Sequence, residues 1–101
     1  MKLSIVSTLY FSAPSLVDFY NRIKTEAAKV SPNSFEIILV NDGSPDESLA
    51  TAIDLAETDP NLIVINLSRN FGHWKAMMTG LKYASGEKIF IIDTLIQTLI
   101  S

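Results

Sequence analysis

Two carboxylates in this 101-residue chain stand where an apolar run ends. Asp42 comes just after the run Phe35–Val40, and Asp93 closes the run Lys88–Asp93. A carboxylate at the end of a buried strand can accept hydrogen bonds from ligand N–H groups, such as a nucleobase imide. It can also bind Mg²⁺ or Mn²⁺ beside substrate phosphates, because hard cations prefer oxygen donors. A single carboxylate is too few ligands for a metal site by itself. Asp42 also belongs to a residue type that is common in turns, so a structural role in a turn is the alternative.

Aromatic and basic side chains near the same segments could hold other parts of a ligand. Tyr10 and Phe11 could stack on a base or could simply pack. Arg69 and Lys75 stand near the start of an expected helix, where the helix terminus and basic side chains both attract phosphate. Each is equally a candidate for a solvated charge. His73 has no second histidine and no cysteine to help it bind a transition metal, so we expect a surface or capping role.

Several classes of protein are disfavoured by the composition. The segment Ser7–Ser15, which follows the first expected strand, contains no glycine, and no P-loop motif occurs, so a nicotinamide-type Rossmann site and a P-loop are both unexpected. A net charge of −3 without a basic cluster disfavours nucleic-acid binding. The absence of cysteine excludes disulfides and thiolate metal sites. No apolar run reaches the roughly 18 residues of a membrane span, so we expect a cytoplasmic chain that starts with a strand rather than a signal peptide.

Apolar runs and helical spacing alternate along the chain and predict the elements that position these residues. The expected strands are Lys2–Thr8, Phe35–Val40, Leu62–Leu67 and Lys88–Asp93. The expected helices are Pro14–Val30, a segment that begins at Pro45, and roughly His73–Ala84.

Caps and apolar stripes refine these helices. Ser44 and Glu47 have the spacing of a capping box for the second helix, and Gly86 is placed to terminate the third. The stripes expected to face the core are Leu16, Tyr20, Ile23, Ala27 and Val30; Leu49, Ile53 and Ala56; and Trp74, Met77, Met78 and Leu81.

The strands predict the architecture. The last three are nearly continuous apolar runs, which are typical of parallel strands covered by helices on both faces. With right-handed crossovers, this order of elements predicts a three-layer α/β fold whose mostly parallel sheet has the strand order 3-2-1-4. Ligands of such sheets bind beyond the carboxyl ends of the strands, here at the switch point between strands one and four. Thr8–Tyr10, Asp42 and Asp93 all stand at that edge.

Three stretches together resemble the amino-terminal half of a family 2 glycosyltransferase of the GT-A fold. They are "LSIVSTLYFS" (Leu3–Ser12), "EIILVNDGSPDES" (Glu36–Ser48) and "INLSRNFGHWKAMMTGLKYASGEKIFIID" (Ile65–Asp93). The nearest likeness is to the polyprenyl-phosphate glycosyltransferases, which act on dolichol or undecaprenyl phosphate. The second and third stretches are long and specific. The first is looser, because Thr8 stands where many relatives have proline.

The resemblance implies a role for each candidate residue. Asp42 would hydrogen-bond the base of a nucleotide diphospho-sugar, and Asp93 would be the first acid of a D-x-D motif that holds Mg²⁺ or Mn²⁺. Gly72 and Lys75 would belong to the rim of the donor pocket. The nucleoside pocket would be lined by Thr8, Leu9 and Tyr10.

The resemblance ends at Asp93. Leu95 stands where the family has its second acid, and the acceptor-binding half with the catalytic base does not follow. We therefore assign residues 1–93 to the nucleotide-sugar-binding half and 94–101 to an aberrant apolar tail, name no catalytic residue, and expect little or no turnover. A frame shift would explain the tail, since a leucine codon ending in G and an isoleucine codon, as for Leu95 and Ile96, contain an aspartate codon across their junction. A natural short paralogue and a deliberately shortened chain are the alternatives.

Two further functions stay open. A non-catalytic module would keep Asp42 and bind a nucleotide or another protein. Without a second half, a sheet edge and a helix-packing face should lie uncovered, and the tail is apolar, so we expect a homo-oligomer. Membrane association stays open, because many of the longer relatives carry membrane helices beyond this point. A receiver-type signalling domain shares the layering, but Ile65–Asn70 offers no phosphoacceptor aspartate.

Overall fold

The computed structural model describes residues 2–9, 16–43, 47–67, 69 and 71–92. The expected tail, together with Ser44 and Pro45, lies outside this set. The described elements are, in order, β1 (Leu3–Leu9), α1 (Leu16–Val30), β2 (Phe35–Asn41), α2 (Ser48–Thr58), β3 (Leu62–Asn66), α3 (His73–Tyr83) and β4 (Lys88–Ile91). The strands form one parallel sheet in the order β3-β2-β1-β4, which confirms the predicted topology.

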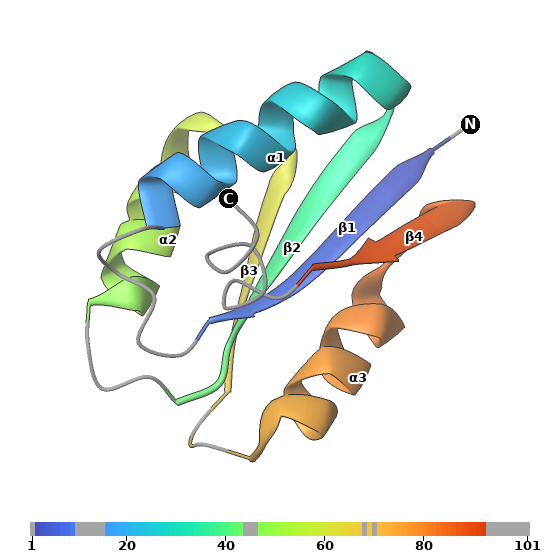
Figure 1. Cartoon of the computed structure of the whole chain (residues 1–101). Helices are drawn as coiled ribbons and strands as arrows, with labels where there is room; N and C mark the ends of the chain where they lie inside the picture. The colour runs from blue at the N-terminus through green and yellow to red at the C-terminus, as the bar shows by residue number, and fades with distance from the viewer. Residues whose placement is uncertain (1, 10–15, 44–46, 68, 70, 93–101) are drawn as a thin grey trace.

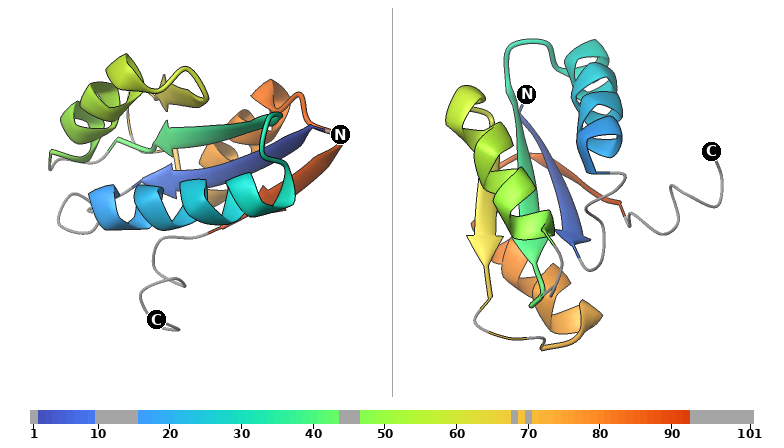
Figure 2. Two further views of the ribbon diagram at one scale, coloured as in Figure 1. Left: turned by 90° about the horizontal axis from the view of Figure 1, so that it is seen from above. Right: turned by 90° about the vertical axis from the view of Figure 1, so that its left-hand side faces the viewer.

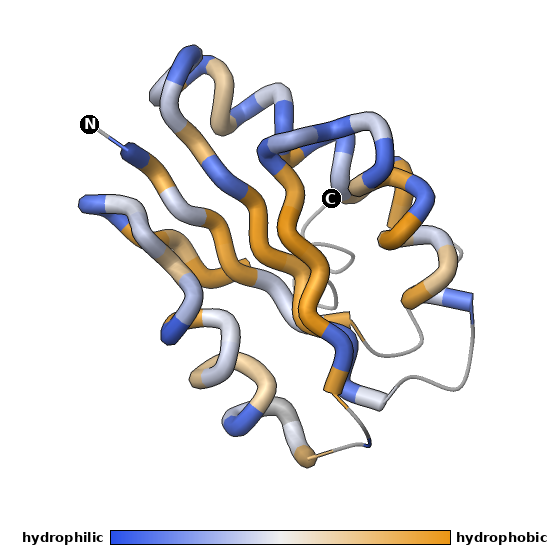
Figure 3. The backbone as a smooth tube through the Cα atoms, turned by 180° about the vertical axis from the view of Figure 1, so that it is seen from behind, coloured by the Kyte–Doolittle hydropathy of each residue, from blue (hydrophilic) through white to orange (hydrophobic). Residues whose placement is uncertain are grey.

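The sheet is the middle of three layers. Helices α1 and α2 cover one face and α3 covers the other (Figure 1), and Figure 2 shows the same layering from two further sides. Alternate residues of β1 serve the two faces: Ile5 belongs to the core under α1 and α2, and Val6 to the core under α3. Both central strands are buried along their whole length, which accounts for the hydrophobic middle of the tube in Figure 3.

Small residues set the distance between α3 and the sheet. Ala76 and Met77 are buried against Val6 and Val40. At Gly80 a Cβ would lie only 2.4 Å from Val6 Cγ1 and 3.0 Å from Val40 Cγ2, so the helix approaches the strands as closely as a glycine allows.

The predicted apolar stripes are only partly right. On α3, Met77 is buried as expected, but Trp74 and Met78 point to solvent with exposed fractions of 79% and 55%. On α2, Ile53 is exposed and Ala52 is buried instead. The stripe of α1 is confirmed except at Val30, which is exposed at the end of the helix; Phe19 joins the buried face.

The prediction that the last two strands are covered on both faces is wrong for β4 and only partly right for β3, whose residues pack against both cores. β3 is only partly buried, and all four residues of β4 are exposed. The reason is position: among the described strands β3 and β4 lie at the two edges of the sheet, and α3 contacts mainly β1 and β2. Ile89, Phe90 and Ile91 consequently keep 42–52% of their surface exposed.

Two of the predicted helix ends also differ. Helix α2 begins at Ser48, and Glu47 is its N-cap residue without a side-chain capping hydrogen bond, so Glu47 is not the third residue of a capping box. Helix α3 ends at Tyr83, before Gly86. Gly86 instead donates its N–H to Ser4 Oγ at 2.8 Å, and a Cβ there would lie 2.7 Å from the Ser4 nitrogen. This glycine is therefore required by the close approach of the α3–β4 connection to β1.

Candidate functional site

The carboxyl edge of the sheet brings the predicted nucleoside-pocket residues together. Leu9 pairs with Asn41 at the ends of β1 and β2, and Thr8 pairs with Val40. The Asp42 N–H donates to the Leu9 carbonyl oxygen at 3.1 Å. Thr8, Leu9 and Asp42 thus share one corner of the sheet, as the parallel order predicted.

Asp42 is a buried carboxylate that holds a loop in place. Its exposed fraction is 4%. Its Oδ1 accepts the Phe71 N–H at 2.9 Å, which fastens the β3–α3 loop to the end of β2. The Leu67 N–H donates to the Asn41 carbonyl oxygen at 3.0 Å and draws the start of the same loop to β2. The structure gives Asp42 Oδ2 no hydrogen bond within the described part of the chain, so this oxygen is the one that could accept a ligand N–H.

Gly72 follows Phe71 directly and connects this corner to α3. It is the N-cap residue of the helix, with φ of 98°, a conformation that favours glycine because it has no Cβ. Its carbonyl oxygen accepts the Ala76 N–H at 3.1 Å, which begins the helix. The N-terminus of α3, with its partial positive charge, therefore starts at the carboxyl edge.

Lys75 is placed differently from the other candidates. It is exposed and lines a surface cavity of about 480 Å³ between the β3–α3 loop and the outer side of α3, together with Phe71, Trp74 and Met78. The corner formed by Thr8, Leu9 and Asp42 is not among the walls of this cavity. Gly72 therefore lies next to the corner, because the preceding residue, Phe71, is hydrogen-bonded to Asp42. Lys75 instead lies on the outer face of α3.

Tyr10 and Asp93 lie outside the described residues, and so does the side chain of His73. The strands that precede Tyr10 and Asp93 run in parallel toward the same edge, and the Ile92 N–H donates to the Val6 carbonyl oxygen at 2.9 Å. Among the described residues, no group of three or more histidine, aspartate or glutamate side chains could hold a metal ion. The described residues alone therefore do not fit a divalent-cation site.

Glu36, a second buried carboxylate, lies near the opposite, amino-terminal end of β2. Glu36 Oε2 accepts hydrogen bonds from Ser4 Oγ at 2.6 Å and from the Ser85 N–H at 2.7 Å, and Lys2 Nζ lies 3.4 Å from Oε1. Burial raises the pKa of Glu36, but these hydrogen bonds and the lysine charge outweigh it, so the pKa is lowered overall. Glu36 thus clamps the α3–β4 connection to β1 and β2.

Asp59, the third buried carboxylate, joins α1 to the α2–β3 turn. It accepts hydrogen bonds from the Tyr20 hydroxyl and, at 2.9 Å, from the Asn61 N–H, and Lys24 Nζ lies 3.4 Å away. Burial raises the pKa of Asp59, while the hydrogen bonds and Lys24 lower it, with a net lowering. Burial and the bond to Asp59 raise the pKa of Tyr20. Within the described residues, Glu36 and Asp59 accept hydrogen bonds from several donors each, whereas the Asp42 carboxylate accepts one, from the Phe71 N–H, so Asp42 is the best candidate of the three for a ligand.

Sequence reasoning missed three polar groups near this edge. Asn41 Nδ2 donates to Asn66 Oδ1 at 3.1 Å, which links the ends of β2 and β3. Ser7 Oγ and Asn41 Oδ1 are buried without a hydrogen-bond partner within the described residues. The available signal was Ser7 within an expected strand and Asn41 directly after one, because unpaired buried polar groups cost about 1–3 kcal/mol and call for an explanation.

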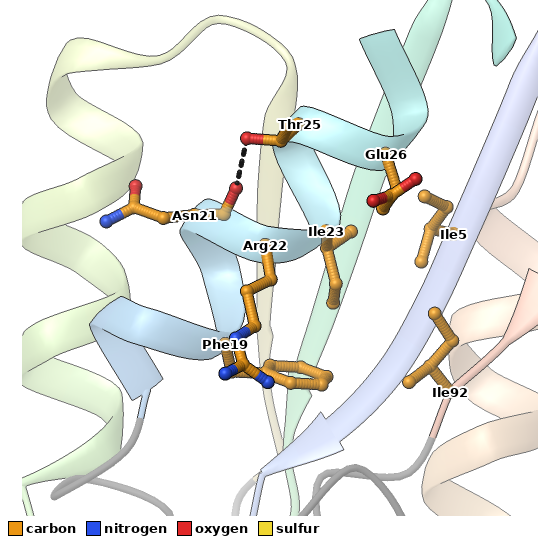
Figure 4. A pocket seen from close by; sticks show the side chains of 8 residues that line it. All are labelled: Ile5, Phe19, Asn21, Arg22, Ile23, Thr25, Glu26 and Ile92. Atoms are coloured by element: carbon orange, nitrogen blue, oxygen red, sulfur yellow. Dashed lines mark hydrogen bonds between the residues drawn. The ribbon is translucent and has the colours of Figure 1, made fainter. Parts of the chain in front are cut away.

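A larger surface cavity, of about 620 Å³, lies between α1 and β4. Figure 4 shows Ile5, Phe19, Ile23 and Ile92 in its wall, with the polar side chains of α1 around them. The polar side chains that line it come from α1 alone. This cavity exists because nothing described covers β4 on the α1 side.

A four-stranded parallel sheet in the order β3-β2-β1-β4 with helices on both faces is the arrangement found in a GT-A glycosyltransferase fold. Residues 4–94 match the profile of glycosyl transferase family 2, and the chain belongs to this family.

Relatives and solved structures agree with this assignment. The chain is 53% identical over 94 residues to a protein of Mycobacterium tuberculosis described as "Putative glycosyltransferases", covering 93% of this chain and 27% of that protein. It is 33% identical over 97 residues to the bactoprenol glucosyl transferase of Shigella phage SfV, covering 96% and 31% of the two chains. The structure of S. aureus TarS 1–349 in complex with UDP matches with a TM-score of 0.76 and 26% identity, covering 99% of this chain and 31% of TarS. The chain thus spans less than a third of these proteins.

Proposed function

We propose that this chain is the donor-binding half of a glycosyltransferase that moves a sugar from a nucleotide diphospho-sugar to a polyprenyl phosphate. The main structural support is the corner of the sheet where Asp42 donates its N–H to the Leu9 carbonyl oxygen and accepts the Phe71 N–H with its carboxylate. The TarS complex with UDP supports a nucleotide donor, and the bactoprenol glucosyl transferase of Shigella phage SfV supports a polyprenyl acceptor.

In this proposal the nucleoside enters beside Thr8, Leu9 and Tyr10. Asp42 Oδ2 accepts an N–H of the base, while Oδ1 keeps the loop of Phe71 in position. The diphosphate lies toward Gly72 and the N-terminus of α3, where backbone N–H groups favour negative charge. In the complete reaction an acceptor phosphate oxygen bonds to the anomeric carbon, and the bond from that carbon to the diphosphate breaks, which releases the nucleoside diphosphate.

Titration calorimetry with UDP-, GDP- and dTDP-sugars tests donor binding. We expect one nucleotide class to bind, and Asp42→Asn to weaken it by about tenfold or more, because hydrogen bonds to a charged group contribute about 1.5–3 kcal/mol. Asp54→Asn, at an exposed position of α2, is the matched control and should bind as the wild type does. Equal binding by the Asp42 and Asp54 variants would refute the role of Asp42.

The proposal includes a divalent cation, Mg²⁺ or Mn²⁺, with Asp93 as one oxygen ligand. When bound, such an ion would neutralise charge on the diphosphate leaving group. The same titrations with and without Mn²⁺ test this part: affinity should rise with the ion, and Asp93→Asn should remove the increase. An increase that survives this substitution would exclude Asp93 as a ligand.

We further propose that this chain alone turns over little or no donor, since it spans less than a third of its relatives. Release of nucleoside diphosphate in the presence of polyprenyl phosphate and Mn²⁺ is the assay. Metal-dependent sugar transfer by the 101-residue chain would contradict this statement.

The alternative is a non-catalytic module that binds nucleotides or associates with itself, and the exposed β4 favours it. Ile89, Phe90 and Ile91 present an apolar surface on an edge strand, which is a feature of association sites. Light scattering should show a dimer or larger species, and Phe90→Lys should shift it toward the monomer while Ile53→Lys on α2 does not. A wild-type monomer at high concentration would contradict self-association.

A further inference from the structure

The outer face of α3 and the loop before it carry three large exposed side chains. Phe71, Trp74 and Met78 expose 37%, 79% and 55% of their surface. Together they line the cavity of about 480 Å³ beside the β3–α3 loop. The sequence predicted that Trp74 and Met78 pack in the core, but the structure leaves both exposed.

Cations surround these side chains. Lys75 and Lys82 line the same cavity, and the Arg69 guanidinium lies 5.0 Å from the centre of the Phe71 ring. The segment from Pro60 through Gly86 contains no aspartate or glutamate, although the whole chain has a net charge of −3. The acids that accept hydrogen bonds from this segment, Glu36, Asp42 and Asp59, are all buried. Although the net charge of the chain is negative, Arg69, Lys75 and Lys82 make this face basic.

We propose that the face formed by Arg69, Phe71, Trp74, Lys75, Met78 and Lys82 docks on an anionic lipid surface. Aromatic and apolar side chains enter the headgroup region, where tryptophan is favoured, and the basic groups attract anionic headgroups. No described helix is long and apolar enough to cross a bilayer, and docking of this kind requires none. The proposal does not depend on the nucleotide site.

Trp74 is the only tryptophan of the chain, so its fluorescence reports on this face alone. Phosphatidylcholine vesicles containing phosphatidylglycerol should shift its emission to the blue and protect it from acrylamide quenching. Pure phosphatidylcholine vesicles should produce a much smaller change. Added salt should weaken binding to the anionic vesicles, because screening reduces the attraction between the cations and the headgroups.

Two substitutions and their controls separate the basic and apolar contributions. Lys82→Glu should weaken vesicle binding at least about fivefold, since each cation near an anionic membrane contributes about that factor. Lys29→Glu is closely matched, because Lys29 is also an exposed lysine in the last turn of a helix, and it should leave binding unchanged. Met78→Ser should weaken binding, whereas Ile53→Ser, at a comparably exposed position of α2, should not.

Several outcomes would overturn the proposal. They are an emission spectrum that anionic vesicles do not change, equal binding to both kinds of vesicle, and equal effects of the Lys82 and Lys29 substitutions. A blue shift that depends on protein concentration without vesicles would assign the face to contacts between copies of the chain instead. If Lys82→Glu fails to fold, as judged by circular dichroism, the salt dependence of the wild-type protein decides the matter.

Discussion

Gly80→Ala tests how closely α3 is set against the sheet. The new Cβ would lie 2.4 Å from Val6 Cγ1, whereas non-bonded carbons pack favourably at about 3.5–4.0 Å. Val6 is fully buried and β-branched, so its side chain has little freedom to move. Overpacking costs about 1–3 kcal/mol, and alanine regains up to about 1 kcal/mol through its helix propensity. Because a 2.4 Å contact is closer than Cβ atoms approach other atoms, the overpacking cost should lie near the upper end of its range, and we expect a net loss of about 1–2 kcal/mol in the free energy of unfolding.

Urea unfolding followed by circular dichroism measures this loss. Val6→Ala removes the methyl group that the new Cβ would meet, so the double variant Val6→Ala/Gly80→Ala should be more stable than the sum of the single effects predicts. Thr79→Ala, one residue away and partly exposed, is the control and should change stability by less than about 0.5 kcal/mol. A Gly80→Ala variant as stable as the wild type, or additive effects in the double variant, would refute the packing argument.

Two further substitutions probe the buried carboxylates. Glu36→Gln should lower stability at neutral pH by about 1–3 kcal/mol, because it leaves donors of the clamp unpaired. The pKa of Glu36 is lowered in the folded state, so its contribution is present above the ordinary glutamate pKa of 4.5 and is lost as the pH falls below it. Thermal unfolding from neutral to acid pH should show the difference from wild type shrinking, with exposed Glu57→Gln as the control; a constant difference would contradict the assignment. Tyr20→Phe should cost about 1–2 kcal/mol by removing the donor to Asp59, and Tyr83→Phe, at an exposed position of α3, should cost nothing measurable; equal stabilities in urea would contradict this.

The order of the strands could be predicted because it follows from the alternation of elements and the handedness of crossovers. The side chains that face the core could not be predicted as well. Helical periodicity predicted that large apolar residues of α3, Trp74 and Met78, face the core. In the structure α3 packs so closely on the sheet that small residues, Ala76 and Gly80, face it instead. An apolar strand such as β4 also carries no sign of whether a helix covers it.

The corner of the site could be predicted for a similar reason. Parallel strands end at one edge, so Thr8, Leu9 and Asp42 had to lie close together once the order was known. The hydrogen bond from Phe71 to Asp42 was missed, because it is made by a backbone N–H and leaves no mark on the residue type. Lys75 lies on the outer face of α3 because of how that helix is rotated about its axis. The predicted apolar stripe, which included Trp74 and Met78, implied a different rotation.

The position of β1 has a consequence for the way the chain acquires its structure during synthesis. β1 is translated before the other described strands, yet it pairs on one side with β4, and Leu3 lies opposite Lys88. Contacts so distant in sequence slow folding, because a long loop must close before they form. We therefore expect a ribosome-bound chain that ends before β4 to leave one side of β1 unpaired and accessible to chaperones, and β1 to pair with β4 only when residue 92 has emerged.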